Sequence, residues 1–298
     1  VPAVSIRAVD GDLLITGIAN TNTGTGSTGN QALFIAVTAD NQVHIYDGNT
    51  ASTKLTNQKN FVDRGTFSVT GDLILNLSNR KDDVVIEFQN GSELDGGIVA
   101  NLFNGNDSLT IRIPDTEGSS TIYGGVTVDG GNGTDQLVID NLDTTGATLD
   151  IQGGVSFNGG AGADTASINN NAAASDLVSI GSGLVLTRVN TVNVGTNNNV
   201  DISGNATINA SADKLITNAF TIGGGTVNIA GALALTGGQG TDGVTLDTVN
   251  IVDVVPAEDE VLEISINLDR GTNTTTLTDI QFGTNGTDAD FNYTGGTG

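Results

Sequence analysis

The sequence predicts an all-β protein, a right-handed parallel β-helix with β-rich caps at its ends. Two observations point to this fold class. Short runs rich in Val, Ile and Leu alternate with turns rich in Gly, Asn and Asp, and no window shows the apolar spacing of a helix. One turn pattern, Gly-Gly-x-Gly-x-Asp, also recurs at a spacing typical of one coil of a solenoid.

The recurring turn sets the expected length of a coil. The pattern is complete at residues 130–135, 159–164 and 237–242, and weaker copies end at Asp107 and Asp288. The final Asp advances from position 107 to 135 to 164, and the 78 residues from 164 to 242 equal three steps of 26. A repeat of 26 to 29 residues predicts that each coil buries its apolar side against the coils beside it.

The period divides the chain into three parts. Residues 61–255 are expected to hold the regular coils, with two or three strands each. Residues 1–60 fit the period poorly, and the runs 32–38 and 42–46 predict an antiparallel hairpin that caps the open end of the sheets. Residues 256–298 predict a β-rich segment that is a second cap, a contact surface or a set of irregular final coils.

Composition narrows the range of functions. The chain has a net charge of −24, and 28 of its 34 acidic residues are Asp, which favours turns and hard-cation ligation. So few basic residues argue against a nucleic-acid partner, and no apolar run reaches the ~18 residues of a membrane span. Without Cys, Trp or Met, the core is expected to consist of Val, Ile, Leu and Ala.

A longer form of the turn, Gly-Gly-x-Gly-x-Asp-x-apolar-x, is complete over residues 130–138 and 237–245. It resembles the nonapeptide of the RTX (haemolysin-type) calcium-binding proteins, in which Asp carboxylates and turn carbonyls ligate Ca²⁺ between stacked turns. The resemblance implies Ca²⁺ as a bound ion. The ligands that it implies here are Asp107, Asp129, Asn132, Asp135, Asp164 and Asp242.

The repeats of that family run in tandem, whereas each copy here is followed by a whole coil. Shared ions therefore require Asp107, Asp135 and Asp164 to stack in one column. Carboxylates stacked only ~5 Å apart repel one another, which favours a cation if the column exists. The turn also has an interpretation without any ion, because Gly supplies a positive φ and Asp closes a turn on its own backbone. Both interpretations stand on the sequence alone.

Catalytic residues are scarce in the sequence, and we expect no enzyme. The single His44 lies beside Tyr46 in an expected strand, where a packed or solvated role is the usual one. Parallel β-helices that cleave polysaccharides gather Asp with Arg or Lys in a cleft, but Arg112 and Arg188 are isolated along the sequence. A polysaccharide-binding or polysaccharide-cleaving β-helix remains the alternative.

The function that we expect is structural. The chain has the general character of adhesin passenger domains and RTX-type secreted proteins. This resemblance implies an extracellular bacterial surface protein: an adhesin stalk, a fibre, a matrix component or an S-layer-like subunit. Its expected partners are other copies of itself or other surface components. The chain is expected to be a mature form or a fragment of a longer protein.

Basic residues gather near the N-terminal end. Six of the ten Lys and Arg residues lie before residue 82, and the rest of the chain is acidic. This asymmetry predicts either a solvated cap or an end at which the acidic end of another copy docks.

Overall fold

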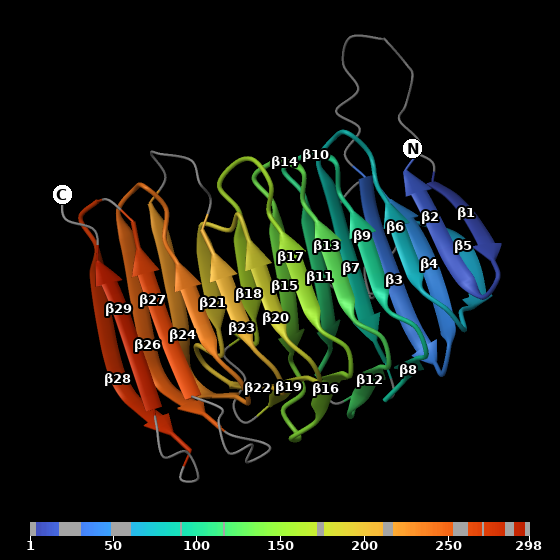
Figure 1. Ribbon diagram of the computed structural model, residues 1–298. Coiled ribbons are helices and arrows are strands. Elements are labelled where there is room, and N and C mark those ends of the chain that lie inside the picture. Colours follow the sequence, from blue (N-terminus) through green and yellow to red (C-terminus); the bar gives the residue numbers. More distant parts are fainter. Residues whose placement is uncertain are drawn as a thin grey trace.

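The computed structural model contains strands, turns and loops, and no helix, among its described residues. These residues are 4–17, 31–48, 61–89, 91–115, 117–171, 176–210, 217–252, 262–269, 271–283 and 289–295. The strands form a parallel β-solenoid of about seven turns, in which coil follows coil from one terminus to the other (Figure 1). The prediction of an all-β parallel β-helix is confirmed.

One face of the solenoid, which we call face A, is a single sheet of 11 strands. Its neighbouring strands are parallel, except that the first is antiparallel to the second. At ~4.8 Å between neighbouring strands, face A extends about 48 Å along the axis. In spatial order the strands are β1 (Val4–Val9), β2 (Asp12–Gly17), β6 (Leu73–Asn76), β9 (Ile98–Asn101), β13 (Val126–Asp129), β17 (Val155–Asn158), β20 (Leu184–Thr187), β23 (Ala206–Asn209), β25 (Leu233–Thr236), β27 (Leu262–Leu268) and β29 (Ala289–Gly295).

Two further faces, B and C, are joined because the later strands run across both. Face B contains, in spatial order, β5 (Phe61–Ser68), β4 (Gln42–Gly48), β3 (Gln31–Ala39), β7 (Asp82–Phe88), β11 (Ser108–Ile113), β15 (Gln136–Asn141), β18 (Thr165–Ile168) and β21 (Thr191–Val194). Face C contains β8 (Glu93–Leu94), β12 (Ser120–Ile122), β16 (Thr148–Ile151), β19 (Leu177–Ile180) and β22 (Asn199–Ile202). The strands that cross both faces are β24 (Asn218–Ile229), β26 (Asp242–Ile251) and β28 (Thr274–Phe282).

The core lies between the three faces and consists of stacked columns of aliphatic side chains. Alternate residues of each strand point inward, and in-register pairing places like residues on like. Ile111, Ile139 and Ile168 are neighbours on three successive coils, and all three are fully buried. Burial of one such side chain contributes about 1.5–3 kcal/mol, so each coil is stabilised chiefly by the coils beside it.

The expectation of a purely aliphatic core is corrected by three buried rings in the main cluster, Phe88, Phe157 and Phe220, and by Phe34 in a second, smaller cluster. Phe157 pairs with Val128 on one side and with Leu186 on the other. A single ring is accommodated because the layers above and below it hold smaller side chains.

The N-terminal strands contain the antiparallel pairings of the described chain. β3 and β4 form the hairpin expected from residues 32–38 and 42–46, and β5 pairs antiparallel with β4. β3 also pairs in parallel with β7, and β2 with β6, so these strands extend faces B and A.

At the other end, the segment expected to be β-rich contains β27, which extends face A, and β28, which extends faces B and C, both with parallel pairings. Within the described part of the chain, no helix has the length and apolar character needed to cross a membrane.

Candidate functional site

Successive coils place the aspartates of the recurring turn in one column. Ser108, Gln136 and Thr165 begin β11, β15 and β18 and are paired in register. The residues that precede them, Asp107, Asp135 and Asp164, therefore lie one above another at the corner that leads into face B. All three are buried, with 2%, 1% and 0% of their surface exposed.

Each carboxylate in this column accepts a hydrogen bond from the backbone of the preceding coil. Oδ1 of Asp107 accepts from the N–H of Asp82 at 2.7 Å, and Oδ1 of Asp135 accepts from the N–H of Asp107 at 2.9 Å. Oδ1 of Asp164 accepts from the N–H of Asp135 at 2.8 Å. The aspartates thus link neighbouring coils through their own main chain.

The column continues beyond the Gly-Asp turns as a mixed ladder of Asp and Asn. The N–H of Asp164 donates to Oδ1 of Asn190, the amide of Asn190 donates to Asn218, and the amide of Asn218 donates to Asp242. The steps are 26, 28 and 24 residues, so the three expected coils between Asp164 and Asp242 are present. We call the whole set, which ends with Asn273, the aspartate column.

The second carboxylate oxygen is unpartnered along much of the column. Oδ2 of Asp107, Asp135, Asp164 and Asp242 is buried and has no hydrogen-bond partner. By contrast, Ser78 donates to both carboxylate oxygens of Asp82. A buried carboxylate oxygen without a donor is unfavourable while the group is ionised.

This environment shifts the titration of the column toward the protonated form. Burial, followed by the charges of neighbouring aspartates, raises the pKa of Asp107 to about 8. Burial and the charges of Asp164 and Asp129 raise the pKa of Asp135 to about 6. Burial also raises the pKa of Asp164 and that of Asp242. In each case, the accepted hydrogen bonds only partly offset the loss of solvation.

The glycines of the turn explain why the motif has its composition. A Cβ atom on Gly130 would lie 2.9 Å from Oδ2 of Asp135, so the first glycine leaves room for the inward carboxylate. A Cβ atom on Gly133 would overlap the carbonyl oxygen of Gly105, one coil earlier. The glycines of the pattern are therefore required because the corners of successive coils stack too closely to admit a side chain there.

Two of the six expected ligands lie outside the column. Asn132 is exposed and donates to Oδ1 of Asn104 at 2.6 Å, in a ladder of amide side chains. Asp129 is exposed at the end of β13 and accepts from the amide of Asn158 at 3.1 Å. The copy of the turn that ends at Asp288 lies outside the described residues.

Unpartnered carboxylate oxygens fit either a proton or a hard cation such as Ca²⁺, which prefers oxygen ligands. In the ranges that the structure describes, no three His, Asp or Glu side chains group closely enough to hold a metal ion together. An ion at the column would therefore use carboxylates of neighbouring coils together with main-chain or water oxygens.

Arg112 does not stand in an open cleft. Its Nε and Nη2 atoms donate to Oε2 of Glu87, one coil earlier, at 2.9 and 2.6 Å. The two side chains are only 13% and 6% exposed. Asp140 pairs with Arg112 in the next coil, and the arginine partly offsets the burial that raises the pKa of this aspartate. Arg188 is exposed elsewhere, at a positive φ of 55°.

His44 takes part in a hydrogen-bonded cluster across β4 and β5. Its ring lies 2.8 Å from Oδ1 of Asp63 and 2.9 Å from the hydroxyl of Thr66, and it stacks on Tyr46 with centroids 4.3 Å apart. The side chain of Asp63 is 62% exposed, so the cluster lies at the surface. These contacts position the imidazole on the sheet.

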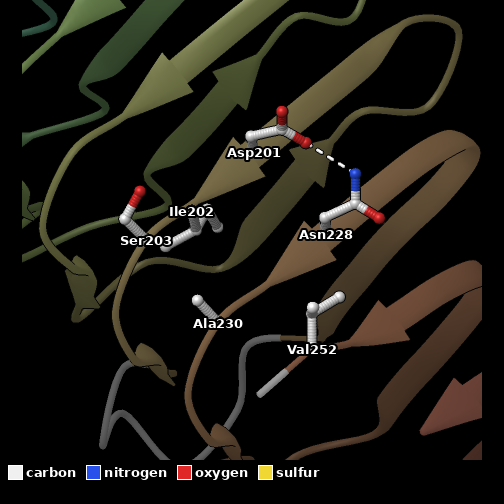
Figure 2. A pocket seen from close by; sticks show the side chains of 6 residues that line it. All are labelled: Asp201, Ile202, Ser203, Asn228, Ala230 and Val252. Carbon is white, nitrogen blue, oxygen red and sulfur yellow. Dashed lines mark hydrogen bonds between the residues drawn. The ribbon is translucent and has the colours of Figure 1, made fainter. Parts of the chain in front are cut away.

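A shallow pocket of about 350 Å³ lies beside face C (Figure 2). It is lined by Asp201, Ile202, Ser203, Asn228, Ala230 and Val252. Its one carboxylate accepts from the amide of Asn228 at 2.6 Å. Hydrolysis of glycosides generally uses two carboxyl groups, and this lining supplies one.

No family model, curated protein or solved structure matches the chain. The class of this protein is therefore defined from its fold and its site alone. It is an acidic parallel β-solenoid whose coils are linked at one corner by a buried column of Asp and Asn.

Proposed function

We propose that this chain is an extracellular structural or adhesive protein of a bacterial surface, in which the solenoid acts as a shaft. The shaft would be a stalk, a fibre, a matrix component or an S-layer-like subunit. The continuity of the core is the main support for this proposal. One hydrophobic cluster extends from Val4 to Leu268, and face A runs unbroken along it. Such an arrangement transmits position and force along an axis.

The outer surface of face A also suits a shaft. From β9 to β25, one row of outward residues consists of small or aliphatic uncharged side chains, although the chain has a net charge of −24. This smooth row fits contact with other surface components along the shaft better than it fits a substrate cleft. Its members are Val99, Thr127, Ser156, Val185, Thr207 and Ala234.

Calcium is the second part of the proposal. The Oδ2 atoms of Asp107, Asp135 and Asp164 lie on successive coils, buried and without donors. Ca²⁺ bound there would compensate the negative charge of these groups and would lower the repulsion along the column. The proposal is supported by the chemistry of these oxygens and by the net charge.

Three measurements test the shaft. Electron microscopy of the purified chain should show short rods, and antibodies against the chain should label the outer surface of the cells that produce it. Incubation with a panel of neutral and acidic polysaccharides should release no new reducing ends and no unsaturated products. Cleavage of any of them would favour the polysaccharide-active alternative and overturn the structural function.

A separate measurement tests calcium. Thermal unfolding at pH 8 should occur at a higher temperature in Ca²⁺ than in chelator, and hydrogen exchange near Asp135 and Asp164 should be slower in Ca²⁺. The variant Asp135→Asn should reduce this difference. Identical unfolding in Ca²⁺ and in chelator would remove calcium from the proposal and leave the shaft unaffected.

A further inference from the structure

The C-terminal end of the solenoid exposes residues that earlier coils bury. Leu277, Phe291 and Tyr293 are 41%, 42% and 47% exposed. Their paired neighbours one coil earlier, Leu246, Ile264 and Ile266, are at most 1% exposed. With Thr275, the three exposed side chains line an open hollow. The core therefore ends here without a covering layer among the described residues.

At both ends of the described chain, the two large sheets end in strands that have one free edge. Face A ends in β1 and β29, face B in β5 and β28, and face C in β8 and β28. Each of these strands pairs with one neighbour only. Exposed edges of this kind are templates for pairing with a further strand (Figure 1).

Two columns of inward residues have complementary sizes at their two ends. The column that ends in Phe291 begins at Ala8, and the column that ends in Leu277 begins at Gly65. Ala8 is exposed, and a Cβ atom on Gly65 would meet nothing within 4 Å. In these two columns a large side chain would face a small one when the columns are continued, whereas the column that ends in Tyr293 begins at the partly buried Ile6.

We propose that copies of this chain associate end to end, with β29 and β28 of one copy pairing with β1 and β5 of the next. β29 would pair antiparallel with β1, because β1 is antiparallel to the other strands of face A. β28 would pair in parallel with β5, because two antiparallel pairings restore the direction of face B. The contact is heterologous and does not close, so it generates a filament.

The charges at the two ends favour a second copy as the occupant. Arg7 is exposed on β1, in the row of outward residues that ends at Asn292 on β29. Asn292 donates to the carboxylate of Glu263 on the neighbouring strand, at 3.1 Å. Continued stacking would bring Arg7 of one copy toward Glu263 of the next, which offsets part of the repulsion between two acidic chains.

Variants that place a charge at either end test this pairing. Sedimentation velocity of the purified full chain across micromolar to millimolar concentrations should show growing rods. Leu277→Glu and Ala8→Glu should each leave monomers, because each blocks one end. Val185→Glu is the matched control, since Val185 is 40% exposed on the side of the shaft, and this variant should still assemble. Circular dichroism would check that all three variants fold.

A mixture of the two blocked variants gives the sharpest result. Leu277→Glu retains an open N-terminal end and Ala8→Glu an open C-terminal end, so an equal mixture should form particles of two chains and nothing longer. The proposal would be overturned if the wild-type chain stays monomeric or if both variants still assemble. It would also be overturned if Ala8→Glu forms dimers without the other variant present. The inference rests on the proposed shaft function. A monomeric chain without polysaccharide activity would reject end-to-end pairing alone, whereas polysaccharide cleavage would reject the shaft itself.

Discussion

The backbone N–H of Asp107 donates to Oδ1 of Asp135, 2.9 Å away and one coil further along the chain. This contact uses one oxygen of a buried carboxylate and leaves the other, Oδ2, without a donor. The same arrangement recurs at Asp164. The column therefore links the coils through hydrogen bonds and at the same time requires positive charge, as protons or as a cation.

The free energy of unfolding should fall as the pH rises from about 4 to about 8 when no calcium is present. The pKa of Asp107 is about 8 and that of Asp135 about 6 in the folded chain, against 3.8 as the ordinary value. In this window the folded state binds more protons than the unfolded state, so a rise in pH favours unfolding. The hydrogen bond from His44 lowers the pKa of Asp63, and its stabilising effect is lost only below this window.

Denaturant unfolding in chelator at about pH 5, 7 and 9 measures this effect. A free energy of unfolding that is constant, or that rises with pH across the window, would show that the column is ionised without cost.

Replacement of Asp135 should separate its hydrogen bond from its charge. Asp135→Ala leaves the buried N–H of Asp107 without an acceptor and should destabilise the fold by about 1–3 kcal/mol. Asp135→Asn keeps the acceptor, as Asn190 and Asn218 do in the same column, and should match or exceed the wild-type stability at pH 8. It should also reduce the pH dependence. Equal losses from both substitutions would contradict the assignment of these roles.

Gly133 should be far less tolerant of a side chain than Gly146. A Cβ atom on Gly133 overlaps the Gly105 carbonyl oxygen, and φ is 145°, so Gly133→Ala should cost about 3 kcal/mol or more. Gly146 also has a positive φ, 88°, but its Cβ position is open, so Gly146→Ala should cost about 1 kcal/mol. Thermal unfolding of the two variants compares them. Similar losses would mean that the corners do not stack as closely as described.

The pair of Arg112 and Glu87 should behave as a covered ion pair. Arg112→Met leaves Glu87, which is 4% exposed, without its partner and should destabilise the chain by about 3–5 kcal/mol. The double variant Arg112→Met, Glu87→Leu should recover part of that loss, because the buried charge of Glu87 is removed while Asp140 still lacks the arginine. A double-mutant cycle from denaturant unfolding provides the test, and additive losses would show that the two side chains are not coupled.

The solenoid could be predicted from the sequence because its turns repeat at the length of one coil. The spacing of Asp107, Asp135 and Asp164 was compatible with a stacked column but did not decide it, and the structure shows that they stack. Asn190 and Asn218 were missed because Asn replaces Asp there, the Gly pattern is absent, and the steps vary from 24 to 28 residues.

The inward direction of the aspartates was not predictable from the turn alone. The sequence of a Gly-Asp turn is compatible with a carboxylate that points toward an ion, toward its own backbone or toward a neighbouring coil. Register between coils decides among these, and it arises only when the chain has folded. The contact of Arg112 with Glu87 has the same origin, because 25 residues separate the two along the sequence.

Carboxyl ¹³C NMR titration of the aspartates tests the column most directly. With calcium removed, we expect Asp107 to titrate near pH 8 and Asp135 near pH 6. With Ca²⁺ present, both midpoints should move to lower pH. Midpoints near 4 for both residues in chelator would show that the buried oxygens need neither proton nor cation, which would contradict the account.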